Sequence, residues 1–357
     1  MTQKRLAGLR EKLAALQVDA ILVTSAVNRR YISGFTGSSG YLLITAADSW
    51  LLTDFRYMTQ APQQASHFTV VEHGPKWIET VRELAEQAGV RKLAFEQDHV
   101  VFSSYSDWKG ALGSIELVPV SGAIEQLRLY KDEEELAVIR EACALADETF
   151  QYILGFIKPG ISERAVALEM EMYMRGKGAT SSSFDTIVAS GERSALPHGV
   201  ASERIIGNNE FVKLDFGALL KGYCSDLTRT IVVGKPTDKH REIYEIVLEA
   251  QMAALAGIKP GMTGREADAI ARDIITKYGY GDKFGHGTGH GFGMEIHEAP
   301  RLSVGGTSVL EPGMTVTVEP GIYLPGFGGV RIEDDIVITE NGNSLLTSSP
   351  KALFILE

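Results

Sequence analysis

The chain has 357 residues, of which 44% are hydrophobic and 23% charged, a composition typical of a globular protein with two domains. A net charge of −11 without a basic cluster disfavours nucleic acid as a partner, and the lack of a long apolar run or a signal-peptide pattern disfavours a membrane span. Two cysteines, Cys143 and Cys224, argue against a disulfide framework and favour a reducing, cytoplasmic compartment.

Residues 1–125 alternate between helical and strand patterns. An amphipathic helical pattern at 1–17 is followed by short apolar runs such as 20–24 and 41–45, with helical stretches further along. This alternation predicts a small mixed α/β domain. The domain has no cofactor fingerprint, and its polar segment 28–40 is either a plain surface loop or a lid or intersubunit loop.

The rest of the chain, residues 126–357, contains an internal repeat of about 100 residues. The sequence IKPG occurs at 157–160 and again at 258–261, and each copy leads through Ser or Thr into a helical pattern. This period is too long for a solenoid. We therefore expect an α+β domain built from two αβ halves related by a pseudo-two-fold axis.

Each half contains two apolar strand patterns joined by a glycine-bearing turn, with one carboxylate on each strand. The pairs are Asp215 with Asp226 and Glu319 with Glu333, and the midpoint of each pair falls in its turn. An antiparallel hairpin would therefore place the two carboxylates of each pair opposite each other. Opposed like charges destabilise a strand pair, so the two pairs predict a bound cation rather than four solvated side chains.

The segment 285–293 reads GHGTGHGFG, with glycine at every second position. This glycine content excludes a helix. In an extended strand His286 and His290 share a face but lie roughly 13 Å apart, so one ion cannot bind both. We expect one histidine to be a ligand and the other to contact substrate. The glycines would leave clearance for a bound peptide backbone.

The candidate inner set offers four carboxylates and one imidazole, without a thiolate: Asp215, Asp226, His290, Glu319 and Glu333. Such ligands select Mn²⁺, Co²⁺, Fe²⁺ or Zn²⁺. Four negative charges are balanced by two divalent ions, with two carboxylates bridging and a shared water or hydroxide that attacks a carbonyl or phosphoryl group.

The neighbouring side chains favour amide chemistry over phosphoryl chemistry. The arginines near the paired carboxylates are Arg229 and Arg331, and phosphoryl transfer would require more basic residues. Three histidines, His198, His286 and His297, could stabilise an oxyanion and move protons during amide hydrolysis.

Together these motifs resemble the pita-bread metallopeptidases, and within them the Xaa-Pro peptidases, aminopeptidase P and prolidase (Xaa-Pro dipeptidase). The motifs that carry the resemblance are LDFG with Asp215, DLTRT with Asp226, GHGTGHGFG, VEPGIY with Glu319 and VRIED with Glu333. The resemblance covers the whole chain, including a smaller N-terminal domain of the creatinase/prolidase type. Creatinase itself lacks the metal carboxylates that this chain retains.

The resemblance implies a site with two divalent ions, most often Mn²⁺, with Co²⁺ or Zn²⁺ as alternatives. It implies that Asp226 and Glu333 bridge the ions, that Asp215 binds one of them, and that His290 and Glu319 bind the other. It further implies that Glu319 accepts the proton of the bridging water.

In the same family pattern His198, His286 and His297 match substrate and proton-transfer histidines, and Arg331 matches an arginine that supports the site, with Tyr323 nearby. The implied reaction is hydrolysis of the Xaa-Pro bond, in dipeptides or at the N terminus of peptides, by a metal-bridging hydroxide. The family also implies a homodimer or homotetramer.

Two alternatives are open. One is a non-catalytic peptide- or protein-binding module on the same fold, which the intact ligand set disfavours. The other is a different metal-dependent amide hydrolase. The short loop GFTGSSG (34–40) favours Xaa-Pro substrates longer than a dipeptide.

Overall fold

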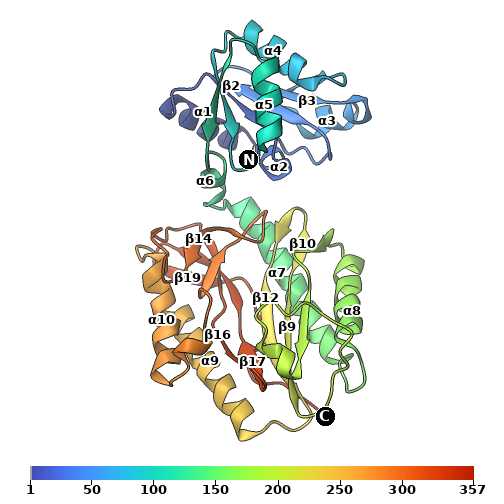
Figure 1. The fold of residues 1–357 in the computed structure, drawn as a ribbon, viewed down its shortest axis with the longest axis vertical. Coiled ribbons are helices and arrows are strands. Elements are labelled where there is room, and N and C mark those ends of the chain that lie inside the picture. Colours follow the sequence, from blue (N-terminus) through green and yellow to red (C-terminus); the bar gives the residue numbers. More distant parts are fainter. Residues whose placement is uncertain (1) are drawn as a thin grey trace. The chain divides into compact units, whose positions relative to one another are not determined.

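The structure is a computed structural model that describes residues 2–357, and the chain forms two compact units, Met1–Arg128 and Leu129–Glu357. Figure 1 labels many of the helices and strands of both. Among the described residues, no helix combines the length and the apolar character that a membrane span would require.

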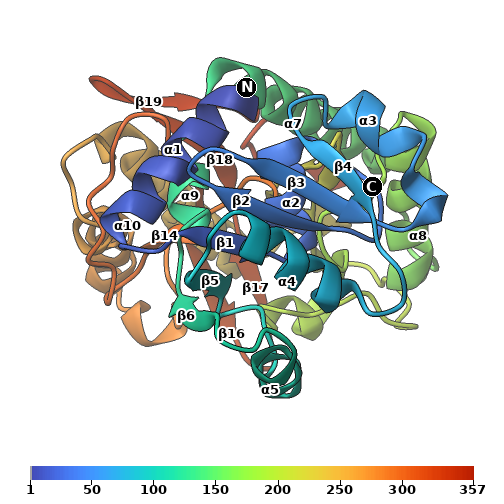
Figure 2. The same ribbon diagram turned by 90° about the horizontal axis from the view of Figure 1, so that it is seen from above.

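The N-terminal unit is a six-stranded mixed sheet with strand order β4-β3-β2-β1-β5-β6, and Figure 2 shows these strands side by side. The helix α1 buries Leu6, Leu9 and Leu13, the apolar stripe that its spacing predicts. Helices α4 and α5 pack on the sheet through Val81 and Trp108. The elements of this unit are α1 (Thr2–Ala15), β1 (Ala20–Val23), α2 (Ala26–Ser33), β2 (Tyr41–Thr45), β3 (Ser49–Thr53), η1 (Phe55–Tyr57), α3 (Gln60–Gln64), β4 (Thr69–Glu72), α4 (Trp77–Gln87), β5 (Lys92–Glu96), α5 (Phe102–Ala111), β6 (Glu116–Val120) and α6 (Glu125–Arg128).

The C-terminal unit places its sheets between two pairs of helices (Figure 1). The larger sheets have the orders β20-β12-β9-β8 and β14-β13-β15-β18-β19. The elements are α7 (Glu133–Leu154), α8 (Glu163–Gly176), β7 (Ser181–Ser182), β8 (Ile187–Ser190), η2 (Gly191–Ala195), β9 (Glu210–Phe216), β10 (Ala218–Leu220), β11 (Tyr223–Cys224), β12 (Leu227–Val233), α9 (Asp238–Gly257), α10 (Gly264–Lys277), η3 (Gly281–Lys283), β13 (Gly289–Gly291), β14 (Glu298–Leu302), β15 (Thr315–Val318), β16 (Gly321–Leu324), β17 (Gly328–Arg331), β18 (Asp334–Thr339), β19 (Gly342–Leu345) and β20 (Ile355–Leu356).

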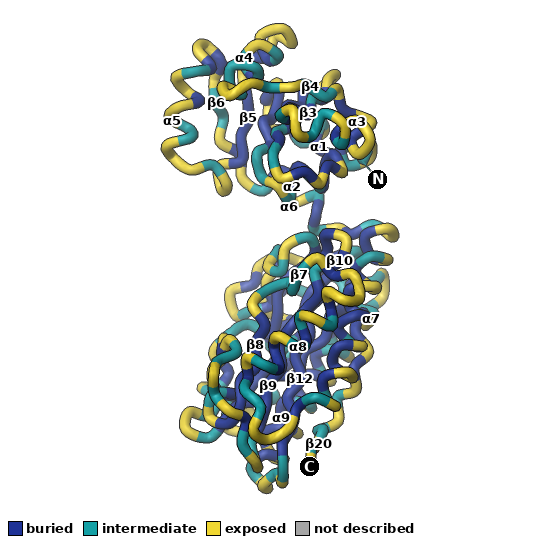
Figure 3. The backbone as a smooth tube through the Cα atoms, turned by 90° about the vertical axis from the view of Figure 1, so that its right-hand side faces the viewer, coloured by how far each residue is buried: buried dark blue, intermediate teal, exposed yellow. Residues whose placement is uncertain are grey.

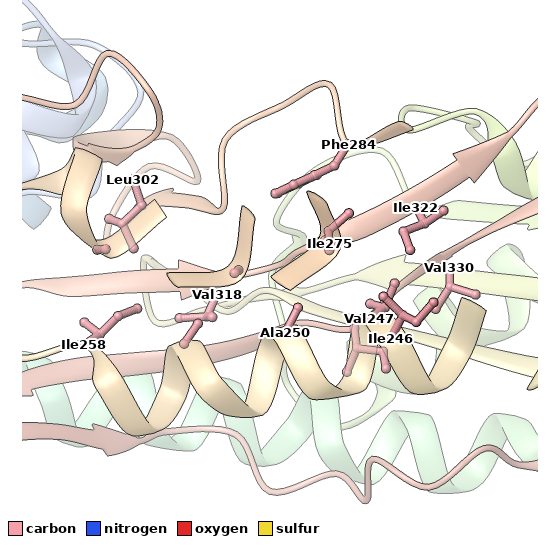
Figure 4. Packing of buried hydrophobic residues seen from close by; sticks show 14 of the residues in the cluster. Ile246, Val247, Ala250, Ile258, Ile275, Phe284, Leu302, Val318, Ile322 and Val330 are labelled. Carbon is pink, nitrogen blue, oxygen red and sulfur yellow. The ribbon is translucent and has the colours of Figure 1, made fainter. Parts of the chain in front are cut away.

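Each pair of helices covers one of these sheets. Helices α7 and α8 share a buried cluster with β8, β9 and β12, and α9 and α10 share another with β15 and β18. Figure 4 shows Val247 and Ala250 of α9 packed among strand residues such as Val318 and Val330. Figure 3 shows β9 and β12 as almost continuously buried, because both of their faces are covered.

The predicted repeat is visible in the hydrogen bonds that surround the two IKPG turns. The amide of Gly160 donates to the carbonyl of Ile206, and the amide of Gly261 donates in the same way to Leu310. The N-cap residues that follow form matching isolated bridges, Ser162 with Ile205 and Thr263 with Val309. The two halves therefore share a local architecture, which confirms the expected construction.

The first carboxylate hairpin differs from its predicted register. Asp215 faces Thr228, so the expected direct opposition of Asp215 and Asp226 is wrong by two residues. The cause is the turn, because Leu220 pairs with Tyr223 and the two residues between them both have positive φ, 51° at Lys221 and 91° at Gly222. Such a two-residue turn with two left-handed residues sets the register of a tight hairpin.

The second hairpin has the predicted register. Val318 pairs with Asp334, so Glu319 and Glu333 align just beyond the paired residues of β15 and β18. Between them, β16 and β17 form a separate two-stranded sheet. Both Glu319 and Glu333 thus lie where the strands break.

The glycine-rich segment is only partly extended, since its strand is limited to Gly289–Gly291. A Cβ atom on Gly289 would lie 1.9 Å from the carbonyl oxygen of Thr317, and one on Gly291 would lie 2.0 Å from that of Ala299. These glycines therefore give clearance to the neighbouring chain segments. The prediction that they make room for a bound peptide is wrong at both positions.

Candidate metal centre and active site

Three carboxylates from both halves of the C-terminal unit meet at one point. Asp215 lies in β9, Asp226 precedes β12, and Glu333 precedes β18. Their ligand oxygens all lie within 4.8 Å of one another. Thr228, the residue that faces Asp215 across the hairpin, donates from Oγ1 to Glu333 at 2.5 Å and accepts the backbone amide of Glu333 at 3.1 Å. This strand residue thereby joins the two hairpins.

His290 and Glu319 lie beside this cluster. The Nε2 atom of His290 is 3.7 Å from a carboxylate oxygen of Asp226 and 3.4 Å from one of Glu319. Its Nδ1 atom lies 3.1 Å from the carbonyl of Gly291, an acceptor that fixes the proton on Nδ1. Burial lowers the pKa of His290 to about 3. The Nε2 lone pair is therefore free and faces the carboxylates.

The carboxylates are held in an unfavourable electrostatic environment. Burial, followed by repulsion from Glu333 and Asp215, raises the pKa of Asp226 well above its ordinary value. Burial and repulsion from Glu319 and Asp215 do the same to the pKa of Glu333. The single positive charge of Arg331 is thus too little to stabilise all of these carboxylates in their ionised form at neutral pH.

The unsatisfied atoms of the cluster fit divalent cations. Asp215 Oδ1, Asp226 Oδ1 and Glu333 Oε1 are buried and have no hydrogen-bond partner among residues 2–357. Buried polar atoms are nearly always paired, and three unpaired carboxylate oxygens at one point are the donors that hard divalent ions prefer. The residues present therefore suit the ions that the charge balance predicts.

Arg331 connects the cluster to its surroundings. It bonds to Asp215 through Nη2, donates from Nη1 to the hydroxyl of Tyr323 at 2.8 Å, and lies 3.8 Å from Glu319 through Nε. Because the Tyr323 oxygen accepts from Arg331, its own proton is free to bond the Nε2 atom of His286, 2.7 Å away. Burial raises the pKa of Tyr323 to about 12, which keeps this proton in place.

His286 is consequently a neutral imidazole with both nitrogens engaged. Its Nδ1 atom lies 2.8 Å from the carbonyl of Gly287, and its Nε2 atom faces Tyr323. Burial and the nearby charge of Arg331 lower the pKa of His286 to about 4.

A cavity of about 450 Å³ lies over the cluster. This volume is within the range of small-ligand sites. His198 and His297 line it and are exposed, while the ring of His297 packs edge-on against His290 at 4.5 Å. Apolar residues form part of the wall, and the cavity-lining residues are Phe184, Asp185, Ile187, Pro197, His198, Val200, Asp215, Asp226, His286, Gly287, Gly289, His290, Ile296, His297, Arg301, Ser303, Glu319, Arg331 and Glu333. All nine residues predicted for the site lie in this lining.

Sequence reasoning missed three polar residues near the site. Arg301 lines the cavity because β14 pairs it with His290, a pairing that no local motif indicates. Asp335 accepts the backbone amide of Asp226 at 2.8 Å, and its place directly after two acidic residues was the available signal. Lys213 lies two residues before Asp215 in the same strand. Because side chains two residues apart in a strand point to the same face, the sequence could have placed Lys213 beside Asp215.

Comparisons with known proteins agree with this geometry. Residues 137–340 match Metallopeptidase family M24, and residues 5–130 match the Creatinase/Prolidase N-terminal domain. A Xaa-Pro dipeptidase of Pyrococcus horikoshii is 43% identical over 94% of each chain. A solved Xaa-Pro dipeptidase from Bacillus anthracis shows a TM-score of 0.98 and 54% identity over 100% of both chains. An X-Pro aminopeptidase from Thermotoga maritima shows a TM-score of 0.92 and 38% identity over 97% of this chain and 100% of that one. These matches confirm the predicted fold class and the prediction of a hydrolase, and the chain belongs to metallopeptidase family M24.

Proposed function

We propose that this chain hydrolyses the peptide bond that precedes proline, in Xaa-Pro dipeptides or at the N terminus of longer peptides, with two divalent ions at its carboxylate cluster. The observation that carries the proposal is the set of buried, unpartnered oxygens on Asp215, Asp226 and Glu333. The relatives described as Xaa-Pro dipeptidases and as an X-Pro aminopeptidase support the substrate class.

We assign Asp226 and Glu333 as the bridging ligands, Asp215 as a ligand of one ion, and His290 and Glu319 as ligands of the other. The free Nε2 atom of His290 and the carboxylate-rich donor set support this assignment and favour Mn²⁺. When bound, the two ions would supply Lewis-acid polarisation of the scissile carbonyl and an activated water molecule.

The chain's own side chains would move the proton and hold the substrate. Burial raises the pKa of Glu319 to about 7, which suits a carboxylate that accepts a proton from the attacking water near neutral pH. His198 and His297 are exposed to the cavity and would donate hydrogen bonds to the developing oxyanion. His286 lines the same cavity and would contact the substrate, while the hydroxyl of Tyr323 holds its imidazole in place.

The cavity also offers features that suit a short peptide ending in proline. Phe184, Val200 and Ile296 form an apolar part of the wall, against which a proline ring can pack. Arg301 is an exposed cation in a cavity that is otherwise rich in carboxylates. It could pair with the C-terminal carboxylate that a dipeptide places one residue beyond the scissile bond.

The substrate assignment is tested by comparing hydrolysis of Xaa-Pro, Xaa-Pro-Yaa and matched Xaa-Ala peptides. We expect cleavage before proline only, loss of activity on chelation, recovery with Mn²⁺ and two ions per chain by metal analysis. Arg301→Gln should raise KM for Xaa-Pro more than for Xaa-Pro-Yaa. Equal cleavage of Xaa-Ala would favour another metal-dependent amide hydrolase, and purified protein that binds no metal would favour a non-catalytic binding module.

The predictions of a homodimer or homotetramer belong to the same proposal. Light scattering of the purified chain would measure its mass in solution. A monomer at the concentrations used for activity would contradict them.

A further inference from the structure

A buried lysine lies next to the candidate metal centre and has no role in the reaction proposed above. Lys213 is in the middle of β9, two residues before Asp215, and its exposed fraction is 0%. It pairs across the sheet with Ala189 on one side and Thr230 on the other. Lysine is almost never fully buried unless a partner compensates its charge. The nature of that partner therefore decides what Lys213 does.

The polar partners of Lys213 in the described part of the chain are backbone carbonyls. Its Nζ atom donates to the carbonyl of Leu196 at 2.6 Å and to that of Pro197 at 3.3 Å. The same Pro197 carbonyl also accepts from Nη1 of Arg331 at 3.1 Å. Two buried basic side chains, Lys213 and Arg331, thus donate hydrogen bonds to the two peptide groups that directly precede His198.

The segment around His198 is held by hydrogen bonds more than by apolar packing, and one of them runs from Nη2 of Arg193 to the carbonyl of Val200. The side chains of Leu196 and Val200 are 48% and 47% exposed, and His198 is exposed as well. Apolar packing therefore contributes little to its position, and exposed loops of this kind are normally mobile. Pro197 lacks an amide hydrogen, so its carbonyl is the polar group through which its backbone can be anchored.

We infer that Lys213 is a positioning residue, which together with Arg331 anchors the backbone before His198 so that the imidazole keeps its place in the lining of the cavity. The inference rests on the proposed function for the part that concerns His198 and catalysis. Burying an ammonium group is unfavourable, and in return the protein gains a loop of fixed geometry. Displacement of a substrate-contacting group by about 1 Å can reduce a rate by about 10².

The test replaces Lys213 by methionine, which has a similar length and no charge, with Lys235→Met at an exposed position as the matched control. We expect Lys213→Met to lower kcat for an Xaa-Pro substrate at least tenfold with a smaller change in KM, and to leave the bound metal content unchanged. Its melting temperature should change little, because removal of a buried ammonium group offsets the loss of two hydrogen bonds to backbone carbonyls. A lower melting temperature together with a proportional loss of folded protein would indicate a purely structural role and overturn the inference.

A double-mutant cycle with His198→Ala isolates the coupling. If Lys213 acts through His198, Lys213→Met should change kcat by less than about twofold in the His198→Ala background. An undiminished effect in that background would refute the inference. Lys213→Arg, which keeps the charge and the donors, should recover most of the lost kcat. Should Lys213→Met fail to fold, Lys213→Gln takes its place in the same comparisons.

Hydrogen exchange separates this inference from the peptidase proposal. The amides of Gly199 and Val200 donate within the loop, to Leu196 and His198 respectively. Mass spectrometry of a peptide that contains both should show at least tenfold faster exchange in Lys213→Met than in Lys235→Met. Wild-type protein without Xaa-Pro activity would overturn the proposed function alone, whereas unchanged exchange would overturn the anchoring role of Lys213.

Discussion

The substitution Glu319→Gln should have opposite effects on the metal-free and the metal-loaded protein. Burial raises the pKa of Glu319 from its ordinary value of 4.5 to about 7, in spite of the attraction of Arg331. Between these pH values the folded state holds a proton that the unfolded state has lost, so stability falls as the pH rises through this window. A shift of this size corresponds to a cost of about 3 kcal/mol at pH 8 and about 1 kcal/mol at pH 5.

Glutamine removes that charge and keeps an oxygen to accept the hydroxyl of Thr317, which lies 3.3 Å from the present carboxylate. Metal-free Glu319→Gln should therefore be more stable than metal-free wild type by about 3 kcal/mol at pH 8, and by about 1 kcal/mol at pH 5. In the presence of Mn²⁺ the order should reverse, because wild type gains binding energy that the variant has lost.

The free energy of unfolding of both proteins is measured by urea denaturation after chelation, at pH 5 and pH 8. The unfolding transition of the C-terminal unit is identified as the one that added Mn²⁺ shifts. Glu333 and Asp226 remain in both proteins, but repulsion from Glu319 is one cause of the raised pKa of each. Removing this charge lowers both pKa values in the variant, which adds to its stability at pH 8 and has little effect at pH 5, where Glu319 is protonated. A metal-free variant that is no more stable than wild type at pH 8, or a difference that does not shrink at pH 5, would refute the reasoning.

Three further predictions follow from the packing of the site. Gly291→Val should abolish soluble protein, because even its Cβ would lie 2.0 Å from a neighbouring carbonyl oxygen, while Gly285→Ala, with open space around its Cβ, should express and melt like wild type. Cys224→Ser should retain activity and the native thiol should resist alkylation, because burial raises the pKa of Cys224 to about 12. Tyr323→Phe should raise the pKa of His286 above about 4, because it removes the hydroxyl that donates to the neutral imidazole and stabilises it. NMR of the imidazole measures this pKa. An unchanged pKa would show that burial and Arg331 alone set it.

Much of the chemistry of the site could be predicted from residue types and spacing. The paired carboxylates Asp215, Asp226, Glu319 and Glu333 stand out because like charges placed at matching points of two apolar hairpins need a compensating cation. The duplicated IKPG turns could be recognised because proline and glycine mark the start of a capped helix in the same way wherever they occur. These signals depend on residues that are close together in the chain, so they can be recognised in the sequence alone.

The register of the first hairpin and the neighbours of the glycine-rich strand could not be predicted in the same way. The register of the first hairpin differs from the prediction because Lys221 adopts a positive φ of 51°. Residues other than glycine rarely adopt this conformation, and no sequence motif predicted it here. The alternating glycines correctly excluded a helix, but the groups that need their space are the carbonyls of Thr317 and Ala299, which only strand pairing brings there.

By itself, then, the sequence determined the kind of site this protein has: which carboxylates and imidazoles are present, on which type of element, and how many positive charges they need. Tertiary structure alone decided which atoms share one buried volume. It brings Glu333 against Thr228, holds His286 through Tyr323, and directs Lys213 to the backbone before His198. The physical reason is that charge and backbone propensity belong to each residue. Burial, pKa and hydrogen-bond partners instead depend on distances between residues that lie as far as 134 positions apart in the chain.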